Sequence, residues 1–211
     1  MSAECETIHK LAGELERHGF AFDESKIPLN GIYLLFQKGE EGHQGERIVR
    51  IGTHTGDNQL QPRLKQHFLN QNKDRSIFRK NIGRALLNQG NDPFLEHWEL
   101  DLTTRKAKEK YLSLIDLDYQ KTIEAKVSEF IQTNFSFCVF EVNSKEQRLQ
   151  IESGLISTVS WCEECKSSKT WLGNASPKNK IIKSGLWLVN MLYKMPFNSS
   201  DIEHLSRLIK G

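Results

Sequence analysis

Two short strand-like runs, separated by a glycine-containing polar segment, most constrain how this chain can fold. Ile32–Phe36 is aromatic-rich and apolar on both faces, which is typical of a central strand. Arg47–Ile51 follows after a polar segment that contains Gly39, Gly42 and Gly45. The simplest pairing of two such strands is an antiparallel hairpin, with the polar segment as a flexible connection.

Helical periodicity dominates the rest of the chain. A strand-like alternation appears once more, at 135–142, and a strand-like start at Trp98–Leu100 precedes helical spacing that continues to residue 131. We expect further helices over about 6–18, 63–70, 76–88 and 144–165, and one that opens with a capping box at Ser200–Glu203. This order of elements predicts an α/β (α+β) fold built on a small antiparallel or mixed sheet.

The composition supplies enough apolar surface for a folded core. Hydrophobic residues make up 37% of the 211 residues and include 4 Trp and 11 Phe, which excludes an intrinsically disordered chain. No apolar stretch approaches the ~20 residues needed to span a bilayer, and Met1–Glu4 is unlike the start of a secretory signal. We therefore expect a soluble, cytoplasmic protein without a membrane partner.

Basic residues gather in two blocks, although the net charge is only +2. Residues 61–90 hold seven basic side chains and one acid, and residues 166–183 hold five lysines and no acid. Two such blocks favour a surface for a polyanion, with Arg75, Arg79 and Lys80 as candidate phosphate contacts. The alternative is two ordinary solvated helix faces.

The cysteines give only a weak metal signal. Cys162-Glu-Glu-Cys165 is a single C-x-x-C pair, whereas a structural zinc site needs four ligands. We therefore expect reduced thiols at the surface there, with metal binding as the alternative. Cys138 lies in an apolar run and is expected to be buried.

Glu152 is a carboxylate that the helical pattern places among apolar residues. Leu149, Leu155, Ile156 and Val159 surround it at ~100° per residue. A carboxylate is costly to bury unless it is paired or bound to a cation. Glu152 is therefore expected to be either half of a buried Glu–Arg ion pair or a metal ligand, for which its oxygens suit Mg²⁺.

Arg63 and His67 are four residues apart on an expected helix, which places them on one face. A planar guanidinium beside an imidazole can hold a phosphate and assist proton transfer. The R-x-x-x-H pattern is common on surface helices, so its weight comes from its position just after the hairpin.

These elements occur in the order found in the GIY-YIG nuclease domain, and the chain resembles that family over about residues 30–187. The first tripeptide is matched in full and Ser184–Trp187 is similar to sequences that follow the domain. The elements that carry the resemblance are Gly31-Ile32-Tyr33, Arg50-Ile51-Gly52, Arg63-x-x-x-His67, Glu152 and Gly173-Asn174.

The resemblance implies a three-stranded antiparallel sheet flanked by helices, and a metal-dependent endonuclease that cuts DNA with a single Mg²⁺ or Mn²⁺ ion. The expected partner is DNA, and the oligomeric state is left open between monomer and homodimer. By the same resemblance Tyr33 activates the attacking water, His67 accepts or relays its proton, Arg63 binds the scissile phosphate, Glu152 holds the metal and Asn174 fixes the phosphate side of the cleft.

The second tripeptide departs from the family pattern. Arg50 stands where the family has tyrosine, which removes a hydroxyl that usually helps to orient the water. Arg50 is a candidate phosphate clamp instead. His54 is either a replacement proton acceptor or a loop histidine that caps backbone groups. A DNA-binding module with weak or lost catalysis is therefore the alternative function.

The expected organisation has three parts. Residues 1–27 form an N-terminal helical extension, 28–190 the nuclease-like domain and 191–211 a C-terminal helix. An insertion at about 91–134 carries no motif and is expected to stabilise the domain, with contact to DNA or a second subunit as the alternative.

Overall fold

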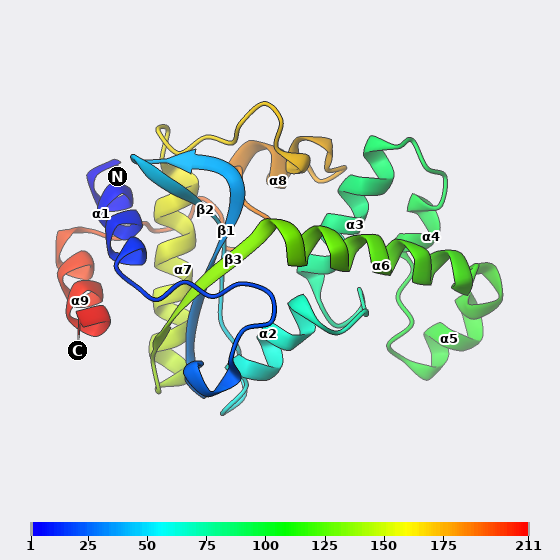
Figure 1. Ribbon diagram of the computed structural model, residues 1–211, viewed down its shortest axis with the longest axis horizontal. Helices are drawn as coiled ribbons and strands as arrows, with labels where there is room; N and C mark the ends of the chain where they lie inside the picture. Colours follow the sequence, from blue (N-terminus) through cyan, green and yellow to red (C-terminus); the bar gives the residue numbers. More distant parts are fainter. Residues whose placement is uncertain (1, 211) are drawn as a thin grey trace.

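A three-stranded antiparallel sheet lies at the centre of the protein, as Figure 1 shows. The computed structural model describes residues 2–210, in which β1 (Gly31–Gly42) lies between β2 (Gly45–Gly52) and β3 (Phe135–Glu141). Tyr33 on β1 pairs with Gly52 on β2 and with Val139 on β3. The hairpin, the third strand and the fold class are thereby confirmed.

The segment that joins the two hairpin strands is not a flexible connection, which corrects the prediction for it. β1 and β2 continue to Gly42 and Gly45 and leave only His43 and Gln44 in the turn. Glu40 in this polar stretch is buried, and its carboxylate lies 2.6 Å from the guanidinium of Arg47. The ion pair neutralises the buried charge of this polar stretch, whereas Lys38 and Glu41 remain exposed.

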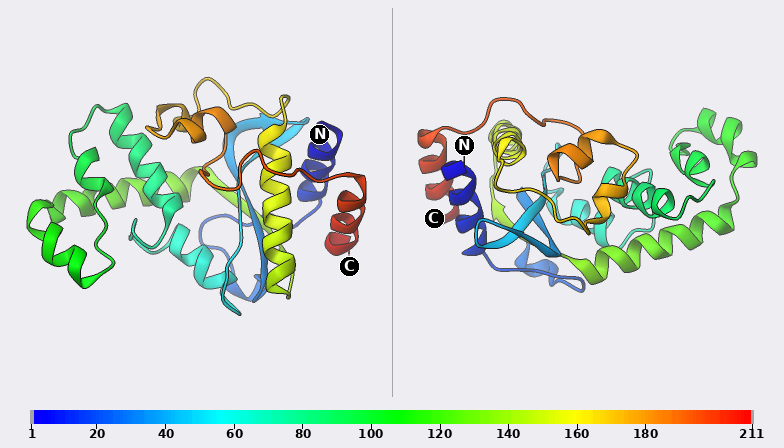
Figure 2. Two further views of the ribbon diagram at one scale, coloured as in Figure 1. Left: turned by 180° about the vertical axis from the view of Figure 1, so that it is seen from behind. Right: turned by 90° about the horizontal axis from the view of Figure 1, so that it is seen from above.

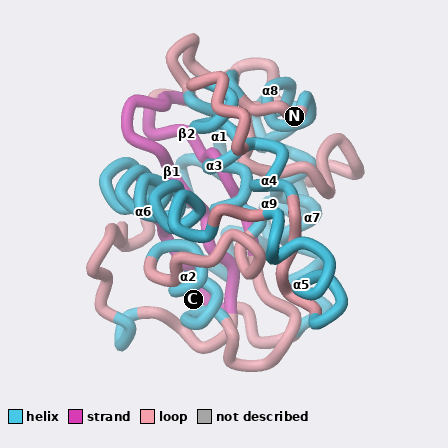
Figure 3. Tube along the Cα trace, turned by 90° about the vertical axis from the view of Figure 1, so that its right-hand side faces the viewer, coloured by secondary structure: helices cyan, strands magenta, loops and turns pink. Residues whose placement is uncertain are grey.

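Helices cover both faces of the sheet. α7 crosses one face with α1 and α9 beside it, and the view from behind in Figure 2 places α7 in front of the strands. α2, α3 and α6 cover the other face, where Figure 3 looks along α6 toward the sheet. The helices are α1 (Ser2–Gly13), α2 (Leu60–Phe68), α3 (Ile77–Gln89), α4 (Leu95–Glu99), α5 (Arg105–Tyr111), α6 (Leu117–Asn134), α7 (Lys145–Trp161), α8 (Asn179–Ser184) and α9 (Ser199–Lys210), with short 3₁₀ turns η1 (Glu24–Lys26), η2 (Leu112–Leu114) and η3 (Leu172–Ala175).

Each face of the sheet has its own apolar core. Along β1 the side chains of Ile32 and Leu34 pack with α1 and α7, whereas Tyr33 and Leu35 pack with α2, α3 and α6. This alternation is the period of two that a strand imposes. All four side chains are buried, so β1 is a central strand with core on both sides, as predicted.

Trp98 is helical, and the strand-like start predicted at 98–100 is wrong. The residue lies on α4, where its indole N–H donates to the carbonyl of Lys80 (3.0 Å). The ring fits against Gly83, since a Cβ there would lie 2.3 Å from it. An aromatic residue here fills a gap beside α3 rather than pairing with another strand. The same insertion contributes α6, which buries Val127 and Ile131 as the helical spacing predicts.

Several helix ends differ from the predicted ones. α7 ends at Trp161, four residues before the predicted end at 165. α1 ends at Gly13, and His18 instead forms an isolated bridge with Phe137. The cap of α9 is formed by Asn198 and Asp201, whose side chains each accept a hydrogen bond from the other's backbone N–H. The reciprocal capping is therefore real but lies two residues earlier than the Ser200–Glu203 box.

Within residues 2–210, every helix is too short or too polar to cross a membrane.

Candidate active site

A chain of hydrogen bonds links β1 to the two helices that follow the hairpin. The hydroxyl of Tyr33 lies 2.8 Å from Nε2 of His67 on α2, and Nδ1 of His67 lies 2.7 Å from the hydroxyl of Ser76. Ser76 is the N-cap of α3, so its oxygen also accepts the backbone N–H of Arg79. All three side chains are buried. In a neutral imidazole one ring nitrogen donates a hydrogen bond and the other accepts one. Since each ring nitrogen of His67 faces a hydroxyl, a proton can pass along the chain.

Gly52 fixes the position of the Tyr33 hydroxyl. A Cβ at Gly52 would lie 2.2 Å from that oxygen, so any other residue would displace the ring. Gly31 is constrained in the same way, because a Cβ there would lie 2.2 Å from the carbonyl oxygen of Phe140 on β3. Both tripeptide glycines are therefore explained by close approach, and the Tyr33 hydroxyl is held at the end of β2.

His67 is held in its neutral form. Burial lowers its pKa well below the ordinary histidine value, and the nearby guanidinium groups of Arg50, Arg63 and Arg79 lower it further. A neutral imidazole keeps a lone pair that can accept the proton of the Tyr33 hydroxyl.

Glu152 reaches the same strand end from the opposite face of the sheet. It lies on α7, and its Oε1 accepts the backbone N–H of Thr53 at 3.1 Å, one residue after Gly52. Thr53 directly follows the last residue of β2, so a side chain on α7 can reach this strand end without crossing the sheet. Tyr33 and Glu152 are thus brought to adjacent residues of one strand end.

The surroundings of Glu152 differ from the predicted apolar stripe. Leu149 is 39% exposed and Glu152 is half-buried, so the carboxylate lies at the border of the buried face. No ion pair to it forms among residues 2–210, so the Glu–Arg alternative is wrong. Burial raises the pKa of Glu152, while Arg50, the Thr53 N–H and Arg63 act in the opposite direction.

The donor set at this point fits one hard divalent cation. Mg²⁺ keeps several water ligands and is commonly bound through one or two carboxylates and the phosphate of a substrate. Glu152 supplies one carboxylate, whose Oε1 accepts a hydrogen bond from the backbone N–H of Thr53. Arg50 and Arg63 are positively charged and would repel a cation at Glu152. The negative charge of a bound phosphate would offset this repulsion.

Arg63 borders an open cleft beside this strand end. The cleft has a volume of ≈ 300 Å³ and is lined by residues 53–56 and by Gln59, Arg63 and Gln66. The guanidinium of Arg63 donates to the side chain of Gln66 (3.1 Å) and to the carbonyl of Arg75 (3.3 Å), and its buried Nε has no hydrogen-bond partner within residues 2–210. Arg63 therefore lines an open cleft with one of its guanidinium nitrogens unpaired, and its predicted contact with a phosphate stays a prediction.

Arg50 lies inside the site and is not free to clamp a phosphate. It is 3% exposed, and its Nη1 donates to the carbonyl of Trp187 at 2.5 Å. Arg50 pairs with Leu35 on β1, which places its side chain on the same face of the sheet as Tyr33. Its positive charge lowers the pKa of both His67 and Glu152.

Two further predicted residues are tied to backbone groups. Nδ1 of His54 donates to the carbonyl of Gly56 (2.6 Å), and its Nε2 accepts the N–H of Gly31 (3.3 Å). The backbone-capping interpretation of His54 is correct and the proton-acceptor interpretation is wrong; burial also lowers its pKa. Asn174 donates its amide to the carbonyls of Ser168 and Lys169, within its own loop.

Most of the predicted basic surface on α3 is buried. Arg79 is 0% exposed and forms an ion pair with Glu124 on α6 (2.7 Å), and Lys80 donates to the carbonyl of Glu99. Arg84 likewise pairs with the carboxylate of Glu99. Neither Arg79 nor Lys80 is therefore available to a phosphate, and the prediction for them is wrong. Arg75 alone of the three candidates is exposed, close to Arg63.

The sequence-based prediction missed Ser76, Thr53 and the carbonyl of Trp187. Ser76 could have been found as the N-cap of the predicted 76–88 helix, nine residues after His67. The contacts of Thr53 and Trp187 depend on tertiary packing and leave no local signal.

A family model described as the GIY-YIG domain matches residues 5–211 of the chain. No curated protein and no solved structure matches it.

Proposed function

Since the chain belongs to the GIY-YIG family, a family of nucleases, we propose that it is an endonuclease that hydrolyses DNA phosphodiester bonds with one bound Mg²⁺ or Mn²⁺ ion. The observation that carries the proposal is the meeting of two groups at the end of β2. The Tyr33–His67–Ser76 chain arrives there from one face of the sheet and Glu152 from the other, beside the cleft that Arg63 borders.

In this proposal Tyr33 orients the attacking water and takes its proton. Tyrosine has an ordinary pKa of about 10, so it needs a neighbour that accepts its own proton. His67 is that neighbour, because its neutral Nε2 faces the Tyr33 oxygen at 2.8 Å. Ser76 holds the imidazole in place through Nδ1.

Arg63 binds the scissile phosphate and stabilises the charge that develops on it. Glu152 holds the metal ion, which when bound supplies a Lewis acid for the phosphate oxygens. Arg75 extends the positive surface toward the neighbouring phosphates of the DNA strand. Its carbonyl accepts a hydrogen bond from Arg63, which places its backbone next to the site.

A DNA-binding module with weak or lost catalysis is the second candidate. It is favoured by Arg50, which replaces the family tyrosine and whose guanidinium is buried against the carbonyl of Trp187. It is disfavoured by the intact Tyr33–His67 hydrogen bond and by the loss of Arg79 and Lys80 from the exposed basic surface.

The test is cleavage of supercoiled plasmid by the purified protein with Mg²⁺ or Mn²⁺, with and without chelator, and with a single-stranded RNA of equal length as comparison. We expect nicked or linear DNA that appears only with the divalent ion. DNA binding without cleavage at any metal concentration would favour the second candidate. Cleavage of RNA alone would overturn the assignment of DNA as substrate.

A further inference from the structure

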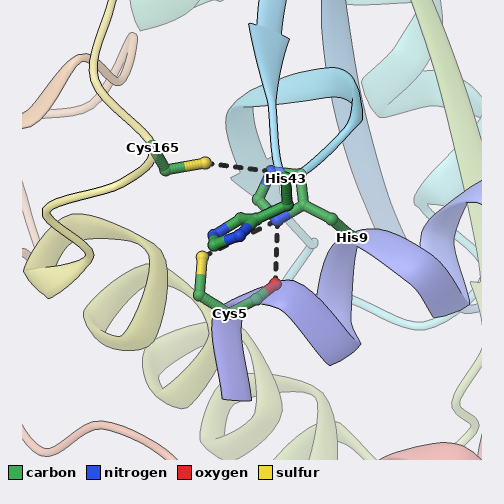
Figure 4. A group of neighbouring side chains, drawn as sticks. All are labelled: Cys5, His9, His43 and Cys165. Carbon is green, nitrogen blue, oxygen red and sulfur yellow. Dashed lines mark hydrogen bonds between the residues drawn. The ribbon is translucent and has the colours of Figure 1, made fainter. Parts of the chain in front are cut away.

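A second polar cluster lies on the other side of the hairpin, away from the Tyr33 chain. Cys5 and His9 come from α1, His43 from the β1–β2 turn and Cys165 from the loop after α7, and Figure 4 shows the four side chains converging. One nitrogen or sulfur atom of each lies within 4.8 Å of those of the other three. We refer to these four residues as the Cys/His cluster.

The spacing within the cluster suits a tetrahedral ion. Cys165 Sγ lies 3.3 Å from Nε2 of His9, the ring nitrogen that is left for an ion when Nδ1 donates to the carbonyl of Cys5. Zinc binds sulfur at about 2.3 Å and nitrogen at about 2.0 Å, so neighbouring ligand atoms in a tetrahedron lie roughly 3.5 Å apart. The cluster is also enclosed, since Cys5, His9 and Cys165 are no more than 7% exposed and the side chain of His43 is 3% exposed.

The backbone is shaped to bring these side chains together. His43 and Gln44 form the hairpin turn with φ of 50° and 62°, a left-handed conformation that such turns usually reserve for Asn and Gly. Gly42 leaves room for Cys165, because a Cβ there would lie 2.7 Å from its sulfur. The loop that carries Cys165 is fixed by Ser168, which donates to the buried carboxylate of Glu40.

The groups around the cluster are those expected around bound zinc. Nδ1 of His9 can donate to the carbonyl of Cys5 (2.9 Å), and such a bond fixes a ligating ring through its other nitrogen. The carboxylate of Glu164 lies 3.9 Å from Nδ1 of His43. Two thiolates would neutralise one Zn²⁺ ion, so the filled site would carry no net charge into the core.

We propose that Cys5, His9, His43 and Cys165 bind one structural Zn²⁺ ion. The ion joins the N-terminal helix, the hairpin turn and the loop after α7, three segments far apart in the sequence. A mixed sulfur and nitrogen donor set selects zinc over Mg²⁺ and Mn²⁺, which prefer oxygen ligands. The site is therefore separate from Glu152 in both position and chemistry.

Cys162 is the neighbour that could replace one ligand. Its sulfur lies 3.3 Å from Nε2 of His43, and Cys162 is itself buried. An ion at His9 would compete with a hydrogen bond, because Nε2 of His9 also accepts the backbone N–H of Ile48 at 3.2 Å. We assign His9 as the fourth ligand, since it belongs to the set whose atoms all lie within 4.8 Å. Burial of Cys162 and Cys165 also corrects the prediction of surface thiols.

The experiment measures zinc in the full chain purified under reducing conditions without added metal, by mass spectrometry of the elements. We expect one zinc ion per chain. Cys165→Ala and His9→Gln should lower the affinity for zinc by more than about 100-fold. Cys138→Ala is the matched control, because Cys138 is equally buried but lies on β3 outside the cluster, and it should keep the ion.

A second measurement uses the unmodified chain, in case the variants do not fold. After removal of metal by chelator, titration with Co²⁺ should give the thiolate-to-metal and visible bands of a tetrahedral site. Titration with Zn²⁺ should then abolish these bands and raise the melting temperature. A chain without zinc that gives neither the bands nor the thermal shift would overturn the proposal. Loss of zinc from Cys162→Ala but not from His9→Gln would overturn the choice of His9.

Discussion

The Tyr33–His67–Ser76 chain and the Cys/His cluster are both buried beside the same hairpin, yet they use histidine in opposite ways. His67 has a hydroxyl partner on each ring nitrogen and faces three guanidinium groups. His9 and His43 instead point their nitrogens at sulfur atoms. A hydroxyl partner on each ring nitrogen lets a neutral imidazole relay a proton, whereas converging thiols and imidazoles favour a soft cation. The partners of a histidine, rather than its burial, decide what it can do.

The largest effect is expected at Glu152, the residue beside the Tyr33–His67–Ser76 chain that we assign to the catalytic metal. Glu152→Gln keeps the size of the side chain and its contact with Thr53 but removes the negative charge. We expect single-turnover cleavage to fall by about 10³-fold or more, with DNA affinity nearly unchanged. The melting temperature should stay the same or rise, because a half-buried charge is gone.

Glu146→Gln on the same helix is the control, since Glu146 is exposed at the start of α7. Near-normal cleavage by Glu152→Gln would show that the metal is bound elsewhere.

Tyr33→Phe tests the proton-transfer half of the comparison. The change removes one hydroxyl and leaves the ring against Gly52, so we expect cleavage to slow by about 10²-fold with unchanged DNA affinity. Tyr119→Phe removes a hydroxyl that is bound to Asp92 far from the cleft, and should have no effect on the rate. Equal rates for the two variants would remove Tyr33 from the reaction.

The neutral state of His67 makes stability depend on pH in a defined direction. Its pKa in the folded protein is lowered well below 6.5, so below that pH the unfolded chain binds a proton that the folded chain does not. The free energy of unfolding should therefore fall as pH falls below about 6.5, by up to about 1.4 kcal/mol per pH unit from this residue.

Urea unfolding at several pH values, compared between the unmodified chain and His67→Gln, isolates this contribution. The variant should lose that part of the slope, and His204→Gln at an exposed position on α9 should retain it. An unchanged slope in His67→Gln would mean that the fold does not lower the pKa of His67.

The smallest effect is expected at Arg75, the exposed member of the predicted basic surface. Arg75→Glu should weaken DNA binding and reduce the slope of log K against log salt by about 1, because one phosphate contact is lost. Arg105→Glu makes the same change on α5, at the end of the helical layer away from the sheet in Figure 1. A slope that changes equally in both variants would indicate a general charge effect.

The sequence was sufficient for the parts of the fold that depend on local pattern. The strands of the hairpin, the helix that carries Arg63 and His67 and the burial of Cys138 all follow from spacing and apolar runs. The order of the family motifs also predicts that Tyr33 and His67 lie side by side, and the structure places the two side chains 2.8 Å apart.

Long-range partners explain what the sequence could not predict. The acid that neutralises Arg79 is Glu124, which is 45 residues away in the sequence. The segment around Arg79 is therefore basic in the sequence, although this charge is paired in the fold. Cys165 and His9 are 156 residues apart, and the C-x-x-C pair that contains Cys165 supplies only one of the four proposed ligands. His43 joins them only because the hairpin turn adopts a left-handed conformation at a non-glycine residue.

The most direct test is anomalous diffraction from crystals of the protein with Mn²⁺ and a DNA duplex that it cannot cut. Data at the manganese edge should show one peak about 2.1 Å from a carboxylate oxygen of Glu152, between that residue and a DNA phosphate held by Arg63. Data at the zinc edge should show a second peak among Cys5, His9, His43 and Cys165. A manganese peak elsewhere, or DNA bound away from the Arg63 cleft, would contradict the assignment of this strand end as the active site of a nuclease.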